Sequence, residues 1–140
     1  MCPEELSQLS KSVIQFYEKL FSWETAIAKN SGLSPQQNHT IEIVGAEGPI
    51  RMKPLAEKLG VTTGTLTVMI DRLQKAGYVD RSNDPNDRRA YNVTLTRSGR
   101  KTYEEHHAYH LKLAEDISGC LDKSELVQFV SILEKINTIF

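Results

Sequence analysis

The sequence predicts a mainly α-helical chain of the α+β kind, in which several helices accompany one small β-hairpin. Three observations predict this fold. Residues 55–78 hold two short helical patterns that meet at a Gly60–Val61 turn, two strand patterns follow within residues 78–94, and long helical patterns with apolar stripes begin and end the chain. Two helices, a tight turn and a hairpin make a winged helix-turn-helix, here set between long N- and C-terminal helices.

The composition is that of one globular domain. The chain has 140 residues, of which 39% are hydrophobic and 25% charged, enough for a substantial core. It contains no run of about 18 apolar residues and no signal-peptide pattern, so we expect a cytoplasmic protein with no membrane partner. Cys2 and Cys120 lie far apart without a CxxC pair, which argues against a disulfide framework.

The first two helices are delimited by helix-capping residues. The pattern of residues 4–29 predicts a long helix, which Asn30-Ser31-Gly32 ends. A second helix is expected after Ser34, which suits the N-cap, with Pro35 at the first helical position, and we expect it to stop at Gly45.

The helix-turn-helix comes next. Its first helix spans residues 54–59, with Pro54 at the favoured first position. Its second helix spans residues 63–76 and has one apolar stripe, while the opposite face is rich in hydroxyl groups. The stripe consists of Leu66, Met69, Ile70 and Leu73. In a helix-turn-helix the second helix enters the DNA major groove, although an ordinary helical hairpin would show the same pattern.

A β-hairpin follows this pair of helices. Residues 78–82 and 88–94 predict two strands, residues 83–87 predict a turn-rich loop, and residues 50–52 predict a short third strand. The hairpin carries three arginines, Arg81, Arg88 and Arg89. Arginines on a hairpin directly after a helix-turn-helix indicate a winged helix that binds DNA.

The chain closes with two further helices, one from about Arg97 to Cys120 and one from Asp122 through Phe140, with Asp122 and Glu125 forming a capping box. The apolar stripes of the terminal helices predict a homodimer. We therefore expect a single unit of residues 1–140, with a DNA-binding lobe at residues 33–100 and a helical dimerisation region at residues 1–32 and 101–140.

Charge is distributed unevenly along the chain. Residues 51–103 contain 11 Lys and Arg against 5 Asp and Glu, a net charge of +6, whereas the whole chain has a net charge of −1. The positive segment coincides with the winged-helix pattern. This coincidence indicates double-stranded DNA as a partner on one face of the protein.

Over nearly its whole length the sequence resembles the MarR family of bacterial transcriptional regulators. The most specific match is the pattern from Asp87-Arg88-Arg89 through Leu95-Thr96 to Gly99. The other matching residues are Leu55-Ala56, Leu59, Val61-Thr62, Ile70, Leu73, Lys75 and Gly77-Tyr78-Val79. Local motifs also resemble two subgroups. His39-Thr40-Ile41, Val44-Gly45, Val61-Thr62-Thr63-Gly64-Thr65 and the pair His106 and His110 resemble the fatty-acid-biosynthesis repressor of Gram-positive bacteria, which binds acylated carrier protein. Glu105-His106-His107, His110 and a histidine in the second helix resemble the zinc-responsive repressor of zinc uptake.

The family resemblance implies a sequence-specific regulator, in most cases a repressor, that binds a pseudo-palindromic operator as a homodimer. The implied DNA-binding residues are Thr62, Thr63, Gly64, Thr65, Thr67, Val68, Arg72, Arg81, Arg88 and Arg89. Of these, Thr63, Thr65, Thr67 and Val68 would face base edges, and Arg88 would enter the minor groove. Arg89 and Arg81 would contact phosphate, and Asp87 would orient an arginine, with Arg72 as the candidate. Gly64 either admits a phosphate close to the backbone or only relaxes the helical turn.

The histidines lie outside the positive segment. His106 and His110 share one helix face at i, i+4, a spacing that lets two imidazoles bind one metal ion. Resemblance to the zinc-responsive subgroup adds His39 and Glu24, which would complete a Zn²⁺ site. The alternative is that these histidines are structural and hydrogen-bonded.

Two further interpretations remain open. A small-molecule effector, acyl or aromatic, would suit an apolar crevice lined by aromatic residues, although such stripes are also typical of plain core. These aromatic residues are Phe16, Tyr17, Phe21, Trp23 and Tyr109. A zinc hydrolase using the histidines with Glu105 as base is the enzyme alternative, but no HExxH, nucleophile elbow, P-loop or Gly-rich cofactor motif occurs, so we expect no enzyme.

Overall fold

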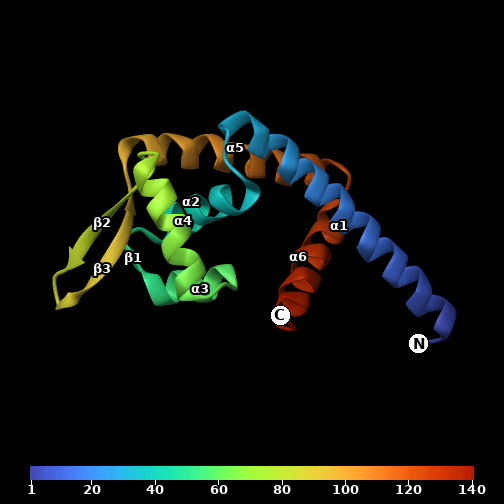
Figure 1. Ribbon diagram of the computed structural model, residues 1–140. Coiled ribbons are helices and arrows are strands. Elements are labelled where there is room, and N and C mark those ends of the chain that lie inside the picture. Colours follow the sequence, from blue (N-terminus) through green and yellow to red (C-terminus); the bar gives the residue numbers. More distant parts are fainter. The chain divides into compact units, whose positions relative to one another are not determined.

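The computed structural model describes residues 1–140, which divide into two units, residues 1–106 and 107–140. The first unit contains the first part of α5 (Arg97–Gly119) and, before it, α1 (Pro3–Ser31), α2 (Pro35–Glu47), β1 (Ile50–Arg51), α3 (Met52–Leu59), α4 (Thr63–Lys75), β2 (Val79–Asp84) and β3 (Asp87–Leu95) (Figure 1). The second unit contains the rest of α5 and α6 (Lys123–Asn137). The predicted fold class, mainly helical with a winged helix-turn-helix, is confirmed.

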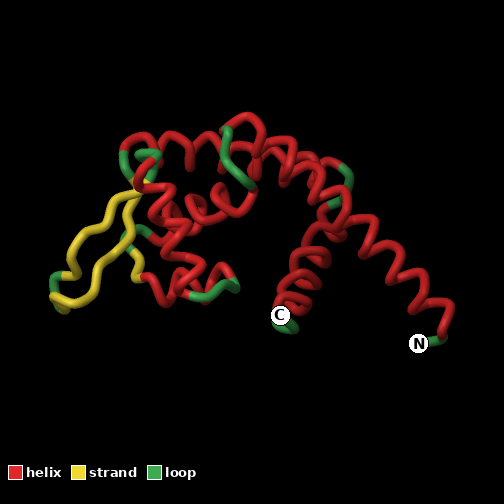
Figure 2. The backbone as a smooth tube through the Cα atoms, in the orientation of Figure 1, coloured by secondary structure: helices red, strands yellow, loops and turns green.

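The three strands form one antiparallel sheet in the order β1-β3-β2 (Figure 2). β1 pairs Ile50 with Val93, so the predicted third strand exists. β2 and β3 run further than predicted, because Asp84 pairs with Asp87 across the turn. The expected five-residue loop is therefore reduced to Pro85 and Asn86 at the tip of the hairpin.

The core of the first unit lies where α2, α3 and α4 meet the sheet. The apolar stripe predicted for α4 is buried, and Leu66, Ile70 and Leu73 are fully inaccessible to solvent. Burying each such side chain stabilises the fold by about 1.5–3 kcal/mol relative to leaving it exposed. The same core contains Ile41, Val44, Ile50, Leu55, Ala56, Met69, Val79 and Val93.

Two predicted helix starts are confirmed by their hydrogen bonds. The Ser34 hydroxyl accepts from the backbone N–H of Gln37, and the Gln37 side chain accepts in turn from the backbone N–H of Ser34. Asp122 accepts from the backbone N–H groups of Ser124 and Glu125 at the start of α6. Both are capping arrangements that satisfy otherwise unpaired N–H groups of a first helical turn.

Three predicted helix boundaries are wrong. α6 ends at Asn137 and does not continue through Phe140. α3 begins at Met52, directly after β1, so Pro54 is its third residue and not its first. That position still lies among the N–H groups that have no intrahelical partner, so proline is tolerated there. α2 continues through Gly45 and ends at Gly48, whose φ of 74° closes the helix. Gly45 serves packing instead, because a Cβ there would lie 2.3 Å from the ring of Tyr103 on α5.

The terminal helices expose much apolar surface in this single chain. α6 buries none of its residues, and α1 buries only Ile27 and Ala28 near its end. The large exposed apolar side chains of α1 and α6 are Leu6, Leu9, Val13, Ile14, Phe16, Tyr17, Phe21, Val127, Val130, Ile132, Leu133 and Ile136. None of the helices combines the length and the hydropathy that a membrane span requires.

Candidate nucleic-acid interface

α4 presents a polar face to solvent on the side opposite the core. The exposed residues of this face are Thr63, Gly64, Thr65, Thr67, Val68 and Arg72. Val68 is unusual among them, since an aliphatic side chain remains 52% exposed on a helix whose other large apolar residues are buried. A branched apolar side chain between hydroxyl groups can contact a thymine methyl group, while hydroxyls bond base edges or phosphates.

Two threonine hydroxyls at the start of α4 are engaged within the protein. Thr62 is the N-cap: its hydroxyl oxygen accepts from the backbone N–H of Thr65 at 3.2 Å, and its O–H donates to the Thr65 hydroxyl at 3.0 Å. The Thr67 hydroxyl donates to the carbonyl of Thr63 at 2.8 Å. Thr62 therefore has a structural role, while Thr67 keeps its methyl group and its oxygen lone pairs for a partner.

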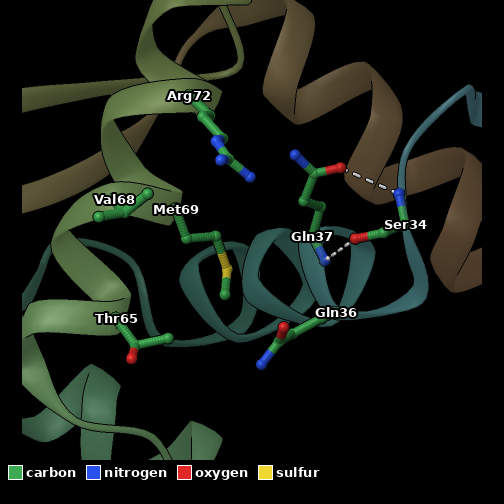
Figure 3. A pocket seen from close by; sticks show the side chains of 7 residues that line it. All are labelled: Ser34, Gln36, Gln37, Thr65, Val68, Met69 and Arg72. Atoms are coloured by element: carbon green, nitrogen blue, oxygen red, sulfur yellow. Dashed lines mark hydrogen bonds between the residues drawn. The ribbon is translucent and has the colours of Figure 1, made fainter.

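A hollow of about 420 Å³ lies between the start of α2 and the exposed face of α4 (Figure 3). Its lining consists of Ser34, Gln36, Gln37, Thr65, Val68, Met69 and Arg72. Figure 3 shows the Arg72 side chain extending from α4 toward Gln37 on α2. The two glutamines could not be predicted as part of this site, since nothing in the local sequence indicates that the start of α2 lies beside α4.

The hairpin of β2 and β3 is the wing, and its tip carries two exposed arginines, Arg88 and Arg89. Asp87 is expected to orient an arginine, with Arg72 as the candidate. In the structure the Asp87 carboxylate instead accepts from the backbone N–H of Arg89 at 2.9 Å. Aspartate commonly bonds the amide two residues later in this way, which fixes the backbone of a turn. Asp87 thus shapes the chain that carries both arginines.

A second carboxylate holds the wing from the side of β1. Asp84 accepts from Nε of Arg51 at 2.7 Å, and Nη2 of Arg51 lies 2.6 Å from the same oxygen. Asp84 also accepts from the backbone N–H of Asn86 at 2.8 Å. The hydrogen bonds from Asn86 and Arg51 lower the pKa of Asp84 below its usual value, because both stabilise the charged carboxylate.

Arg81 differs from the arginines of the wing tip. Its guanidinium forms an ion pair with Asp71 of α4 and is half-buried. The family resemblance implies that Arg81 contacts phosphate, but in the structure the charge of Arg81 is already paired with Asp71.

The wing joins α5 through a close backbone contact. The backbone N–H of Thr96 donates to the carbonyl of Tyr78 at 3.1 Å, and the Thr96 hydroxyl donates to the carbonyl of Gly77. Gly99 lies against the same turn, where a Cβ would be 1.9 Å from the Tyr78 oxygen. In the matching pattern from Leu95-Thr96 to Gly99, Thr96 is therefore needed for its hydrogen bonds and Gly99 for its lack of a side chain.

The structure brings together part of the predicted metal set. Glu24 of α1 and His106 of α5 place a carboxylate oxygen and an imidazole nitrogen within 4.8 Å of each other. His106 is buried, and His110 follows one helical turn later on α5. His39 is exposed and lines a separate hollow of about 340 Å³ with Glu42, Ile43, Ala46, Glu47 and Lys58.

The aromatic residues expected to line an effector crevice lie partly on the surface of this chain. Phe16, Tyr17 and Phe21 of α1 are exposed, and the rings of Tyr17 and Phe21 stack with centroids 6.1 Å apart. An organic effector site built from them stays a prediction.

Comparison with known proteins agrees with this geometry. The model of the MarR family matches residues 33–91, which include α2, α3, α4, β2 and part of β3. The HTH-type transcriptional regulator FarR of Neisseria gonorrhoeae is 30% identical over 99 residues, covering 71% of this chain and 68% of FarR. The uncharacterised HTH-type transcriptional regulator YcgE of Bacillus subtilis is 40% identical over 87 residues, covering 59% of this chain but only 56% of YcgE.

A solved structure extends the similarity to the whole chain. Streptococcus pneumoniae FabT, determined in complex with DNA, matches with a TM-score of 0.89 and covers 96% of both chains. At 21% sequence identity this likeness shows a shared fold.

Proposed function

Because the chain belongs to the MarR family of transcriptional regulators, we propose that it binds a pseudo-palindromic operator in double-stranded DNA as a homodimer and represses the genes beside that operator. Such a regulator acts in the cytoplasm, in the compartment that holds its DNA. One observation carries the proposal: within the unit of residues 1–106, the hydroxyl-rich face of α4 and the arginines of the wing tip are both exposed to solvent.

The roles of these residues follow from their chemistry. Thr63, Thr65 and Val68 of α4 read base edges in the major groove, where a thymine methyl group is the apolar partner of Val68. Arg88 enters the minor groove, in which a narrow A·T-rich segment attracts a cation, and Arg89 binds phosphate.

The hollow beside α4 suits the DNA backbone. Arg72 supplies a cation and Gln36 and Gln37 supply amide groups on its opposite side. Phosphate contacts of this kind fix the register of a recognition helix without reading sequence.

The homodimer would cover the exposed apolar faces of α1 and α6. Isolated apolar residues are normal on a protein surface, but many exposed apolar residues on one helix mark an interface. A two-fold dimer sets its recognition helices about 34 Å apart, one turn of DNA, so the operator repeats its half-site with that spacing.

The experiment is selection of bound sequences from a random 30-bp duplex library, followed by fluorescence anisotropy on the enriched sequence. We expect an inverted repeat with half-site centres about 10 bp apart. Arg88→Ala should weaken operator binding by about 1–3 kcal/mol at fixed salt, the scale of a specific base contact. Lys101→Ala, which removes one exposed positive charge from α5, is the matched control. Failure to enrich any repeat would contradict the proposal. An Arg88→Ala variant that binds as tightly as the wild-type chain would show that Arg88 of the wing does not contact the operator.

Zinc is the second candidate, as an effector of the same regulator. Glu24 and His106 support it, because a carboxylate and an imidazole so close together are suitable zinc ligands. We expect calorimetry to detect about one zinc ion per chain, with binding lost in His106→Ala and retained in His39→Ala, the matched control from the separate hollow. Circular dichroism would verify that both variants fold. Absence of heat with the wild-type chain would exclude zinc as the effector.

A further inference from the structure

Arg81 makes three side-chain contacts, two of which join the wing to α4. It lies on β2, and both of its hydrogen-bonding partners lie on α4. Its Nη2 donates to the carboxylate of Asp71, and its Nη1 donates to Oε1 of Gln74 at 3.0 Å. Its guanidinium also lies 5.2 Å from the ring centroid of Tyr91 on β3. We call these four residues the Arg81 clamp.

The contacts of the clamp leave the Arg81 guanidinium less suited to bind phosphate than the arginines of the wing tip. A guanidinium contacts phosphate through its N–H fork, and here both terminal nitrogens of the fork already donate within the protein. Its positive charge is offset by Asp71, and one face of the group is covered by Tyr91. Arg88 and Arg89, in contrast, are exposed at the wing tip.

The clamp acts at the place where the angle between wing and helix is set. α4 ends at Lys75 and β2 begins at Val79, and the short segment between them is held to α4 by backbone hydrogen bonds such as the one from Tyr78 to Leu73. Arg81 adds side-chain contacts to α4 beyond this segment, on β2 itself. Arg51 and Asp84 tie β2 to β1 near the hairpin tip, but they do not reach α4. From its place on β2, Arg81 contacts both α4 and β3.

We propose that Arg81 is a positioning residue, which holds the wing against α4 so that Arg88 reaches the minor groove while α4 lies in the major groove. The inference rests on the proposed DNA-binding function. A group that contacts DNA must be placed to within about 0.5 Å to bind at full strength. Loss of Arg81 would therefore weaken operator binding by loosening the wing, although Arg81 itself contacts no DNA.

Asp71→Asn separates this role from a direct phosphate contact. The substitution removes the negative charge that pairs with Arg81 and so weakens their contact, and a phosphate-binding Arg81 would then leave operator affinity unchanged or raise it. A positioning Arg81 predicts the opposite, a fall of about 2- to 100-fold, the range expected for coupled residues in contact. Asp80→Asn, an exposed aspartate adjacent to Arg81 on β2, removes the same charge without touching the clamp and should not lower the affinity.

A double-mutant cycle tests the same role through Arg88. Arg81→Met keeps an aliphatic stem but removes the guanidinium. It should lower operator affinity more in the wild-type background than in the Arg88→Ala background, since one of the groups it positions is then absent and only Arg89 remains at the wing tip. Equal losses in both backgrounds would overturn the proposal, as would Asp71→Asn binding the operator as tightly as the wild-type chain.

Hydrogen exchange of the DNA-free protein makes the test independent of the operator. The amides of β2 and β3 should exchange faster in Asp71→Asn than in Asp80→Asn, and equal rates would overturn the clamp. If the wild-type chain selected no operator, the proposed function would fail, and the exchange rates would still decide whether Arg81 holds the wing.

Discussion

Gly99→Ala places one methyl group against a backbone atom that has little freedom to move. The Cβ would lie 1.9 Å from the carbonyl oxygen of Tyr78 and 3.3 Å from a methyl group of Leu95. The Tyr78 oxygen is fixed because it accepts from the backbone N–H of Thr96, while the Tyr78 N–H donates to the carbonyl of Leu73 at 2.9 Å. The wing-to-α5 turn must therefore open to admit the methyl group.

The magnitude follows from three contributions. Overpacking of a tight site costs up to about 3 kcal/mol, and backbone atoms yield less than side chains, so the upper end applies. Breaking the hydrogen bond from Thr96 to Tyr78 costs about 1 kcal/mol. Replacing glycine by alanine in a helix returns about 1 kcal/mol. The net loss is about 3 kcal/mol of unfolding free energy, or roughly 10 °C in melting temperature for a chain of this size.

Urea unfolding followed by circular dichroism measures this loss, with all variants at one protein concentration because dimerisation contributes to stability. Gly119→Ala is the matched control: it lies on the same helix, and nothing lies within 4 Å of its added Cβ. It should be neutral or stabilising by up to about 1 kcal/mol. A Gly99→Ala protein as stable as the wild-type chain would refute the steric reasoning.

Two other predictions concern the DNA face and the wing. Gly64→Ala meets no obstacle inside the protein, since its Cβ would lie 3.9 Å from the Thr62 hydroxyl, so the stability of the fold should be kept or raised. If DNA approaches this backbone, the added methyl group should lower operator affinity. Unchanged affinity in anisotropy would show that Gly64 only relaxes the turn. The pKa of Asp84 is lowered, so its stabilising contacts are complete above the usual pKa of 3.8 and are lost as pH falls through the lowered pKa. Arg51→Gln should raise the Asp84 pKa in a carboxyl NMR titration. An identical titration curve for the variant would contradict the role of Arg51.

Features that depend on neighbours in sequence were predictable. Ser34 and Asp122 cap helices through residues two or three positions away, and these partners are visible in the sequence. The buried stripe of α4 follows from its helical period, as Leu66 and Ile70 show.

Features that depend on distant partners were not predictable. Gly45 resembles a helix stop until the ring of Tyr103, far along the chain, is seen to occupy the space of its missing side chain. Arg81 resembles Arg88 in the sequence, because charge counting does not reveal that Asp71 lies within reach of one and not of the other. In the candidate site, the polar face of α4 could be predicted, whereas the glutamines across the hollow could not.

The short β1 strand has a consequence for how the protein behaves at high concentration. β1 covers only Asn92 and Val93 of β3, so the outer half of β3 exposes one row of backbone N–H and C=O groups. Such a row can pair with a strand of another molecule and start aggregation. Asp87, Arg88 and Arg89 stand along this outer half, and charged side chains there oppose edge-to-edge pairing. Arg88 and Arg89, which are proposed to bind DNA, thus also prevent the wings of neighbouring molecules from pairing.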